Sequence, residues 1–290
     1  MNDCEVVTLP NVLGGDVLPV EQFYAALAEV PKAKQYILDA KHISFVKPYG
    51  IIALLLATRQ LAAHSEYPLQ LKNIPSNIHS YLQRMNFFNV SHNWLTTPDT
   101  LEESWARSAY TPNLLEITVI SNSDDVLNIV SRASRIFSRW LILPDLNGLL
   151  SVISELCANV YEHSQDQLGC VLIQKHSSEQ QGYVQVHLSV GDIGCGIRGS
   201  LAAIHKDIGP EPIKHLLAVM QGRTSRQTGR GGLGLPRVEQ IVRQQNGYLW
   251  IRSETAALLR RGANDLIQKT SLTYLPGTQI AIGFQAPLSS

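Results

Sequence analysis

This sequence lacks the features that mark a nucleic-acid-binding or membrane protein. Its 24 Lys and Arg residues balance 24 Asp and Glu residues, and no basic block is long enough to follow a nucleic-acid backbone. The most apolar run, residues 51–57, is far shorter than the roughly 20 residues that a membrane span needs. The first residues lack the basic start and apolar stretch of a secretion signal. We therefore expect a soluble, cytoplasmic protein that binds neither nucleic acid nor a membrane.

Cysteine is scarce as well. The four cysteines, Cys4, Cys157, Cys170 and Cys195, have spacings typical of neither a metal site nor a redox pair. Reduced thiols in a cytoplasm, mostly small buried side chains, are the expectation. Cys195 stands between two glycines, and it is the only thiol whose reactivity we would test.

The sequence also lacks the two best-known nucleotide motifs. No Gly-Lys-Ser or Gly-Lys-Thr occurs, which excludes a Walker phosphate loop. Residues 194–199 match Gly-x-Gly-x-x-Gly after a predicted strand, but Gly209-Pro210 cut the helix predicted over residues 200–207, and no acid-ended strand follows at about 20 residues. Residues 229–234 match too, yet a polar loop precedes them instead of a strand. A Rossmann fold is therefore disfavoured.

Residues 1–95 alternate strand and helix signals, which predicts a small α/β domain. The predicted strands cover residues 5–9, 35–39, 42–46 and 69–71. The predicted helices cover residues 20–30, 50–64 and 76–88, the last with Ser76 as its cap. Residues 96–112 are rich in Thr, Asn and Pro, which predicts a linker.

Residues 113–290 predict a second domain, in which helices pack against a mainly antiparallel sheet. The predicted helices cover residues 124–140, with Ser123 as cap, and 146–163, 211–221 and 235–245. The predicted strands cover residues 114–120, 170–175, 183–190, 247–253 and 278–284. This order is typical of a two-layer α/β sandwich.

Polar residues follow one stripe of the predicted helix 146–163. Glu155 and Asn159 are four residues apart and share a face, which Glu162 and His163 continue. An acid and an amide on so apolar a helix are costly to bury without partners. A divalent ion would be such a partner, because Mg²⁺ takes oxygen ligands and the Asn159 amide oxygen fits that role. Glu155 could then activate a water or hydroxyl; the alternative is a solvated stripe with accidental spacing.

A second acid stands at the end of a predicted strand. Asp192 enters the sequence Ile-Gly-Cys-Gly, where Gly194 and Gly196 allow a tight backbone turn. A carboxylate there can accept a hydrogen bond from an exocyclic amine, which would select adenine over guanine. The alternative is an ordinary Asp in a glycine-rich turn.

The strongest local signal is Gly-Arg-Gly-Gly-Leu-Gly at residues 229–234, which opens a predicted helix. Backbone N–H groups at a helix N-terminus form an anion site, and Arg223, Arg226 and Arg230 flank this one. The preceding polar stretch, residues 221–228, has the composition of a mobile lid. A flexible loop without function is the alternative.

With these motifs in this order, residues 114–284 resemble the GHKL ATP-binding family (gyrase, heat-shock chaperones, histidine kinases and MutL), whose fold is the Bergerat α/β sandwich. The resemblance implies Mg²⁺ and ATP as cofactors, with Glu155 as catalytic base and Asn159 as Mg²⁺ ligand. The other nucleotide-binding residues that it implies are Asp192, Gly194, Gly196, Gly229, Arg230, Gly231, Gly232, Leu233, Gly234 and Thr278. Length and the glycine-rich lid favour the anti-sigma serine kinase and histidine kinase branch. Histidine kinase activity itself is disfavoured, because none of the nine histidines is followed by an acid.

Residues 1–95 resemble a STAS domain, the fold of anti-sigma-factor antagonists. The resemblance rests on residues 38–46 followed by an apolar helix that begins at Gly50. Where that family usually carries a phosphorylatable Ser or Thr, this chain has Lys47-Pro48-Tyr49. We therefore expect a docking module for a protein partner and no serine switch.

The two resemblances predict an Mg²⁺·ATP-binding regulatory protein that binds ATP or ADP and hydrolyses ATP. An anti-sigma-type protein serine/threonine kinase and a non-catalytic nucleotide-binding scaffold are the alternatives. A homo-oligomer is compatible with the sequence.

Overall fold

The computed structural model describes residues 2–98, 114–138, 143–178, 183–224 and 234–287. Packing divides the chain into two compact units, Met1–Thr111 and Pro112–Ser290. The predicted linker, residues 96–112, lies largely outside the described residues. Among the described residues, no helix is both long and apolar enough to cross a membrane.

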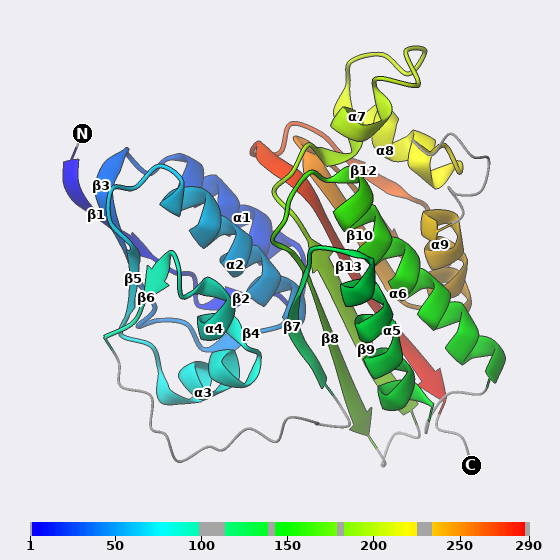
Figure 1. The fold of residues 1–290 in the computed structure, drawn as a ribbon, viewed down its shortest axis with the longest axis horizontal. Coiled ribbons are helices and arrows are strands. Elements are labelled where there is room, and N and C mark those ends of the chain that lie inside the picture. The colour runs from blue at the N-terminus through cyan, green and yellow to red at the C-terminus, as the bar shows by residue number, and fades with distance from the viewer. Residues whose placement is uncertain (1, 99–113, 139–142, 179–182, 225–233, 288–290) are drawn as a thin grey trace. The chain divides into compact units, whose positions relative to one another are not determined.

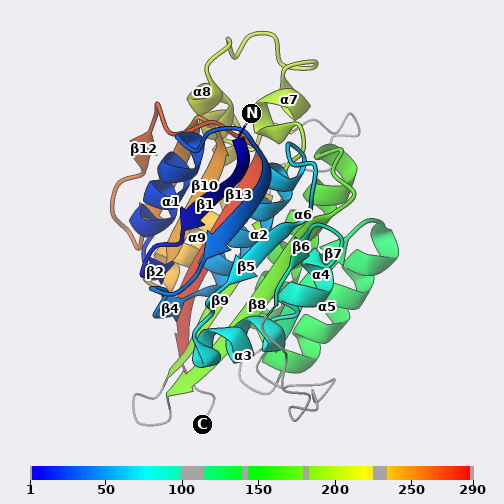
Figure 2. The same cartoon turned by 90° about the vertical axis from the view of Figure 1, so that its left-hand side faces the viewer.

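The first unit is built on a parallel sheet with the strand order β1-β3-β5-β6. Figure 1 labels all four strands, and Figure 2 shows the same sheet from another side. Its strands are β1 (Asn2–Thr8), β3 (Ala33–Asp39), β5 (Leu69–Lys72) and β6 (Leu95–Thr96). A separate parallel pair joins β2 (Val12–Leu13) to β4 (Phe45–Val46). The helices are α1 (Leu18–Ala28), α2 (Pro48–Ala62), α3 (Ser76–Arg84) and α4 (Phe87–Ser91). The predicted α/β alternation is confirmed, although the strand expected at residues 42–46 is limited to β4.

Helix α2 carries the most apolar sequence of the first unit. It begins at Pro48, ahead of the predicted start at Gly50, because proline suits the first helical turn. Gly50 instead serves close packing, since a Cβ there would lie 2.2 Å from the Leu13 carbonyl oxygen of β2. All side chains from Pro48 to Thr58 are buried, as expected for a helix that is apolar around its circumference.

The helix predicted at residues 76–88 is two helices. Asn86 has a φ of 68°, in the left-handed region, so the helical path breaks there and α4 starts in a new direction. The predicted cap was also wrong. Pro75 is the N-cap residue of α3, and Ser76 is already helical.

The second unit is built on a seven-stranded antiparallel sheet with the order β12-β11-β10-β13-β9-β8-β7. Its strands are β7 (Leu114–Ile120), β8 (Gly169–Ser178), β9 (Tyr183–Gly191), β10 (Tyr248–Glu254), β11 (Ala256–Arg261), β12 (Ile267–Lys269) and β13 (Leu275–Pro287). The last of these, β13, is inserted between β9 and β10. Strands β11 and β12 were not predicted.

Five helices complete the described part of the second unit: α5 (Ser123–Phe137), α6 (Leu143–His163), α7 (Gly196–Leu201), α8 (Pro212–Met220) and α9 (Gly234–Gln244). Figure 1 shows α5, α6 and α9 on one face of the sheet, with α7 and α8 near one of its ends. Alternate residues of β9, including Val186, Leu188 and Val190, face α6 residues such as Ile153 and Leu156 in one core. This arrangement confirms the predicted two-layer α/β sandwich.

Two local predictions in this unit were wrong. The cap of α5 is Asn122, whose side chain accepts hydrogen bonds from the Asp124 and Asp125 backbone N–H groups in a capping box, so Ser123 is already helical. The helix after the Asp192 turn runs over Gly196–Leu201 and starts ahead of the expected residues 200–207.

Candidate functional site

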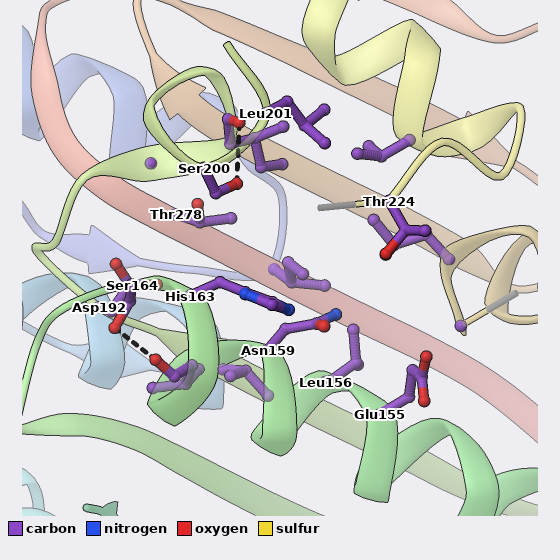
Figure 3. A pocket seen from close by; sticks show the side chains of 18 of the residues that line it. Glu155, Leu156, Asn159, His163, Ser164, Asp192, Ser200, Leu201, Thr224 and Thr278 are labelled. Carbon is purple, nitrogen blue, oxygen red and sulfur yellow. Dashed lines mark hydrogen bonds between the residues drawn. The ribbon is translucent and has the colours of Figure 1, made fainter. Parts of the chain in front are cut away.

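A cavity, partly open to solvent, lies between α6 and α7 in the second unit (Figure 3). The apolar lining includes Leu156, Val160, Ile197, Leu201, Leu235 and Ile280. An apolar lining with few polar groups suits a flat aromatic base.

Helix α6 presents three polar side chains to this cavity. Glu155, Asn159 and His163 recur every four residues, and Figure 3 shows them projecting from the same side of the helix. The polar stripe predicted for this helix is therefore present for these three residues. Glu162 departs from it, because it is exposed and does not line the cavity. Its carboxylate lies 3.6 Å from His163 Nε2.

The end of the cavity nearest the C-terminus of α6 is formed by Asp192. Its side chain is buried, and Oδ1 accepts a hydrogen bond of 2.9 Å from the Gly194 N–H. Its own N–H donates to the Thr278 carbonyl oxygen at 3.0 Å. The pairing of β9 with β13 thus brings together two predicted site residues that are far apart in the sequence.

Two glycines make this arrangement sterically feasible. Gly277 has a φ of 78°, and a Cβ there would lie 2.2 Å from the Asp192 carbonyl oxygen. A Cβ on Gly194 would lie 1.9 Å from the carbonyl oxygen of Ser164, the residue after α6. Any other residue at either position would push the Asp192 segment away from α6 or β13. Gly196, also predicted, lines the cavity.

Asp166 is a supporting residue that the sequence reasoning missed. It is buried, and its two carboxylate oxygens accept hydrogen bonds from the Ile193 N–H at 2.9 Å and the Leu168 N–H at 3.0 Å. The Cys195 N–H also donates to the Ser164 carbonyl oxygen at 2.8 Å. These hydrogen bonds therefore hold the C-terminal end of α6 and residues 192–195 in a fixed position relative to each other. No local pattern could identify Asp166, because its main partner is 27 residues away.

Cys195, the thiol singled out by its neighbours in the sequence, is half-buried. Its Sγ donates to the His163 carbonyl oxygen at 3.0 Å. Burial, and then the negative charge of Asp192, raise the pKa of the Cys195 thiol above its usual value. The surroundings therefore favour an unreactive, protonated thiol.

Helix α7 forms the wall opposite α6 and is tied to the β10–β11 turn. The Ile197 N–H donates to Ser253 Oγ at 3.0 Å, and Ser253 Oγ in turn donates to the Gly277 carbonyl oxygen at 3.0 Å. Arg198 forms a two-pronged ion pair with Glu254, with N–O distances of 2.7 and 2.8 Å. The pair raises the pKa of Arg198, and its two charge-assisted hydrogen bonds hold this wall in place.

The other end of the cavity is formed by Glu155 and the start of α9. A Cβ on Gly234 would lie 2.2 Å from Glu155 Cγ, so the glycine leaves the room that this side chain fills. Arg223 and Thr224, which follow α8, also line the cavity, and Figure 3 shows Thr224 on the side of Glu155. The other predicted phosphate-binding residues, Gly229, Arg230, Gly231, Gly232 and Leu233, lie outside the described residues.

The residues present fit an Mg²⁺ ion that arrives with a nucleotide. Mg²⁺ is typically held by one or two protein oxygens together with waters and substrate phosphates. Asn159 offers such an oxygen in the cavity. Across the described ranges, no cluster of three or more His, Cys, Asp or Glu side chains could hold a metal ion.

Comparison with known proteins supports the resemblance drawn from the motifs. Residues 145–279 match the family described as histidine kinase-, DNA gyrase B- and HSP90-like ATPase. No curated protein matches the chain. The C-terminal region thus carries a GHKL-type domain, which supports ATP binding. The STAS-like resemblance of residues 1–95 stays a prediction.

Proposed function

We propose that the protein binds ATP together with Mg²⁺ in the cavity between α6 and α7 and turns it over. One observation carries this proposal. Glu155, Asn159, Asp192 and Thr278 come from three different segments, line a single cavity, and lie within the segment that matches the ATPase family.

Asp192 is proposed to read the base. A buried carboxylate is stable only if donors satisfy it, and the Gly194 N–H already satisfies part of Oδ1. The exocyclic amine of adenine would add a donor. Guanine presents a carbonyl oxygen at the corresponding ring position, and two acceptors repel. Thr278, whose carbonyl oxygen holds the Asp192 N–H, would lie beside the same base.

Asn159 and Glu155 are proposed to act on the phosphates. The Asn159 amide oxygen would hold Mg²⁺, which neutralises phosphate charge when bound. Glu155 lies one helical turn earlier, about 6 Å along the helix axis. From there its carboxylate would orient and deprotonate a water or a hydroxyl group.

The first unit is proposed to dock a protein partner. Tyr49 and Thr58, the two residues of α2 that carry hydroxyls, are only 5% and 1% exposed. Thr58 Oγ1 donates to the Leu55 carbonyl oxygen at 2.8 Å and accepts from Trp94 Nε1 at 3.1 Å. A kinase could not reach either hydroxyl without unfolding the unit. Peptide mapping of protein from its native cell should find no phosphate on Ser44, Tyr49 or Thr58, and stoichiometric phosphate on any of them would contradict docking alone.

Binding and turnover can be tested on the intact protein. ATP or ADP with Mg²⁺ should raise the melting temperature, and GTP should do so much less. Incubation with ATP labelled at the terminal phosphate then separates the reactions. Released phosphate indicates an ATPase, a labelled partner indicates a protein kinase, and binding with neither indicates a nucleotide scaffold. If no adenine nucleotide raises the melting temperature, the proposed function is wrong.

A further inference from the structure

The cavity has an imbalance of charge among its described lining residues. Glu155 and Asp192 carry carboxylates, whereas Arg223 is the only Lys or Arg in the described part of the lining. A nucleotide with two or three phosphates adds several negative charges to this site. Arg223 is therefore the described side chain best suited to bind a phosphate group, and an arginine binds phosphate well because its N–H groups form charge-assisted pairs.

Arg223 pairs with a residue outside the cavity. Its Nη1 lies 2.5 Å from Asp207 Oδ2, and Asp207 does not line the cavity. The Arg223 guanidinium lowers the pKa of the Asp207 carboxyl, so the pair is charged at neutral pH. A second contact, His205 Nε2 to the Thr224 carbonyl oxygen at 2.9 Å, holds the same two segments together. These two contacts therefore hold the residues that follow α8 against the residues that follow α7.

This ion pair is easily exchanged. The Arg223 side chain is 40% exposed and that of Asp207 is 62% exposed, and ion pairs so open to water contribute little to stability. Asp207 therefore binds the Arg223 guanidinium only weakly.

We propose that Asp207 is an internal competitor that phosphate must displace from Arg223, so that the pair discriminates nucleotides by their phosphate charge. This inference rests on the proposed function of the cavity. Adenosine, which carries no phosphate, leaves the pair intact, whereas ATP offers Arg223 a more highly charged partner. The apparent affinity for ATP is lowered by the fraction of molecules in which Asp207 holds the guanidinium. Removing the charge of Asp207 should raise the ATP affinity and leave the adenosine affinity unchanged.

The chain offers a matched control. Glu211 and Lys214 form an ion pair of 2.9 Å with exposures of 50% and 52%, close to the Arg223–Asp207 pair in sequence. Neither residue lines the cavity. Replacing Glu211 by Gln therefore removes one exposed acid from the same region without freeing a cavity residue.

The test measures the affinities of the full chain for ATP with Mg²⁺, for ADP and for adenosine. Asp207→Asn should tighten ATP binding about two- to five-fold, the range expected for an exposed ion pair, and leave adenosine unchanged. Glu211→Gln should alter neither. Arg223→Gln should weaken the binding of ATP and ADP but not of adenosine, and in that background Asp207→Asn should have no further effect. Melting without nucleotide checks that each variant folds.

The outcomes separate this inference from the proposed function. Suppose that the parent protein binds ATP and adenosine. If Asp207→Asn then leaves the ATP affinity unchanged, or changes the adenosine affinity equally, the competitor role is wrong and the proposed function stands. An effect of Asp207→Asn that persists without Arg223 overturns the competitor role as well. A parent protein that binds no adenine nucleotide removes the proposed function, and this inference with it.

Discussion

The two ends of the cavity are built in different ways. At the end formed by Asp192, backbone hydrogen bonds and two glycines fix the position of every group, and Asp166 ties the strand end to α6. At the end formed by Glu155, the described polar groups belong to side chains, and Arg223 forms an ion pair with Asp207, which lies outside the cavity. Under the proposed function, recognition of the base would therefore be determined by the fold, whereas recognition of the phosphates would depend on side chains that can change partners.

Removing Glu155 should have the largest effect, and it tests whether the end of the cavity that Glu155 forms acts on the phosphates. Glu155→Ala should lower turnover about 10²–10⁴-fold, the usual size of acid–base catalysis, and should change nucleotide affinity only a few-fold. Steady-state phosphate release and equilibrium binding measure the two effects. Glu162→Ala is the control, because Glu162 lies on the same helix outside the cavity. A loss of affinity as large as the loss of turnover would mean that Glu155 positions the nucleotide instead of activating a water.

Asp192→Asn tests the base end. It replaces an acceptor by a group that can present a donor, and hydrogen bonds to a charged group contribute about 1.5–3 kcal/mol, so ATP affinity should fall roughly 10–100-fold. Most of the ATP-induced shift in melting temperature should be lost, and the loss should be as large for adenosine. A variant that loses ATP but keeps adenosine would place Asp192 at the phosphates and reverse the assignment of the two ends.

Gly277→Ala should separate backbone geometry from chemistry. The substitution places a Cβ 2.2 Å from the Asp192 carbonyl oxygen at a left-handed φ, and that conformation alone costs about 1–2 kcal/mol. We expect a lower melting temperature and weaker binding of ATP and adenosine by the same factor. Gly148→Ala on α6 is the control, since a Cβ there meets only ordinary contacts with α9 side chains and should be neutral or stabilising. Equal melting temperatures for the two variants would show that Gly277 is not structurally required.

The smallest expected effect concerns Cys195, which belongs to the rigid end. Its pKa is raised, so near pH 7 the thiol is protonated both folded and unfolded, and it adds no pH dependence to stability there. As the pH rises past the usual thiol pKa of about 9, the unfolded chain ionises first and the folded state loses stability. Alkylation at pH 7.5, mapped by peptide mass, should be several-fold slower at Cys195 than at the exposed Cys4. Faster alkylation at Cys195 would contradict the protected thiol.

The sequence predicted those parts of the site that depend on local spacing. Glu155, Asn159 and His163 follow the helical repeat, and the alternating residues of β9 lead directly to Asp192. Asp166 and the Arg223–Asp207 pair could not be found, because their function depends on partners that only the tertiary structure brings close.

The same limit applies to secondary structure. Ala256–Arg261 consists mostly of good helix formers, yet it forms β11, because pairing with β10 outweighs weak local preference. Asn86 ends a predicted helix by adopting a left-handed conformation that many residues could not. Strong periodicity over long segments is therefore informative, whereas short elements are determined by their neighbours in space.

The place of β13 has a consequence for how the protein is made. This strand is the last of the described strands in sequence but lies between β9 and β10 in the sheet. A ribosome adds about 5–20 residues per second in sequence order, so a nascent chain contains Glu155 and Asp192 well before residue 275 emerges. Until then β9 and β10 each present an unpaired edge, and the Thr278 oxygen that holds Asp192 is absent. The proposed nucleotide site is therefore complete only after β13 has been synthesised.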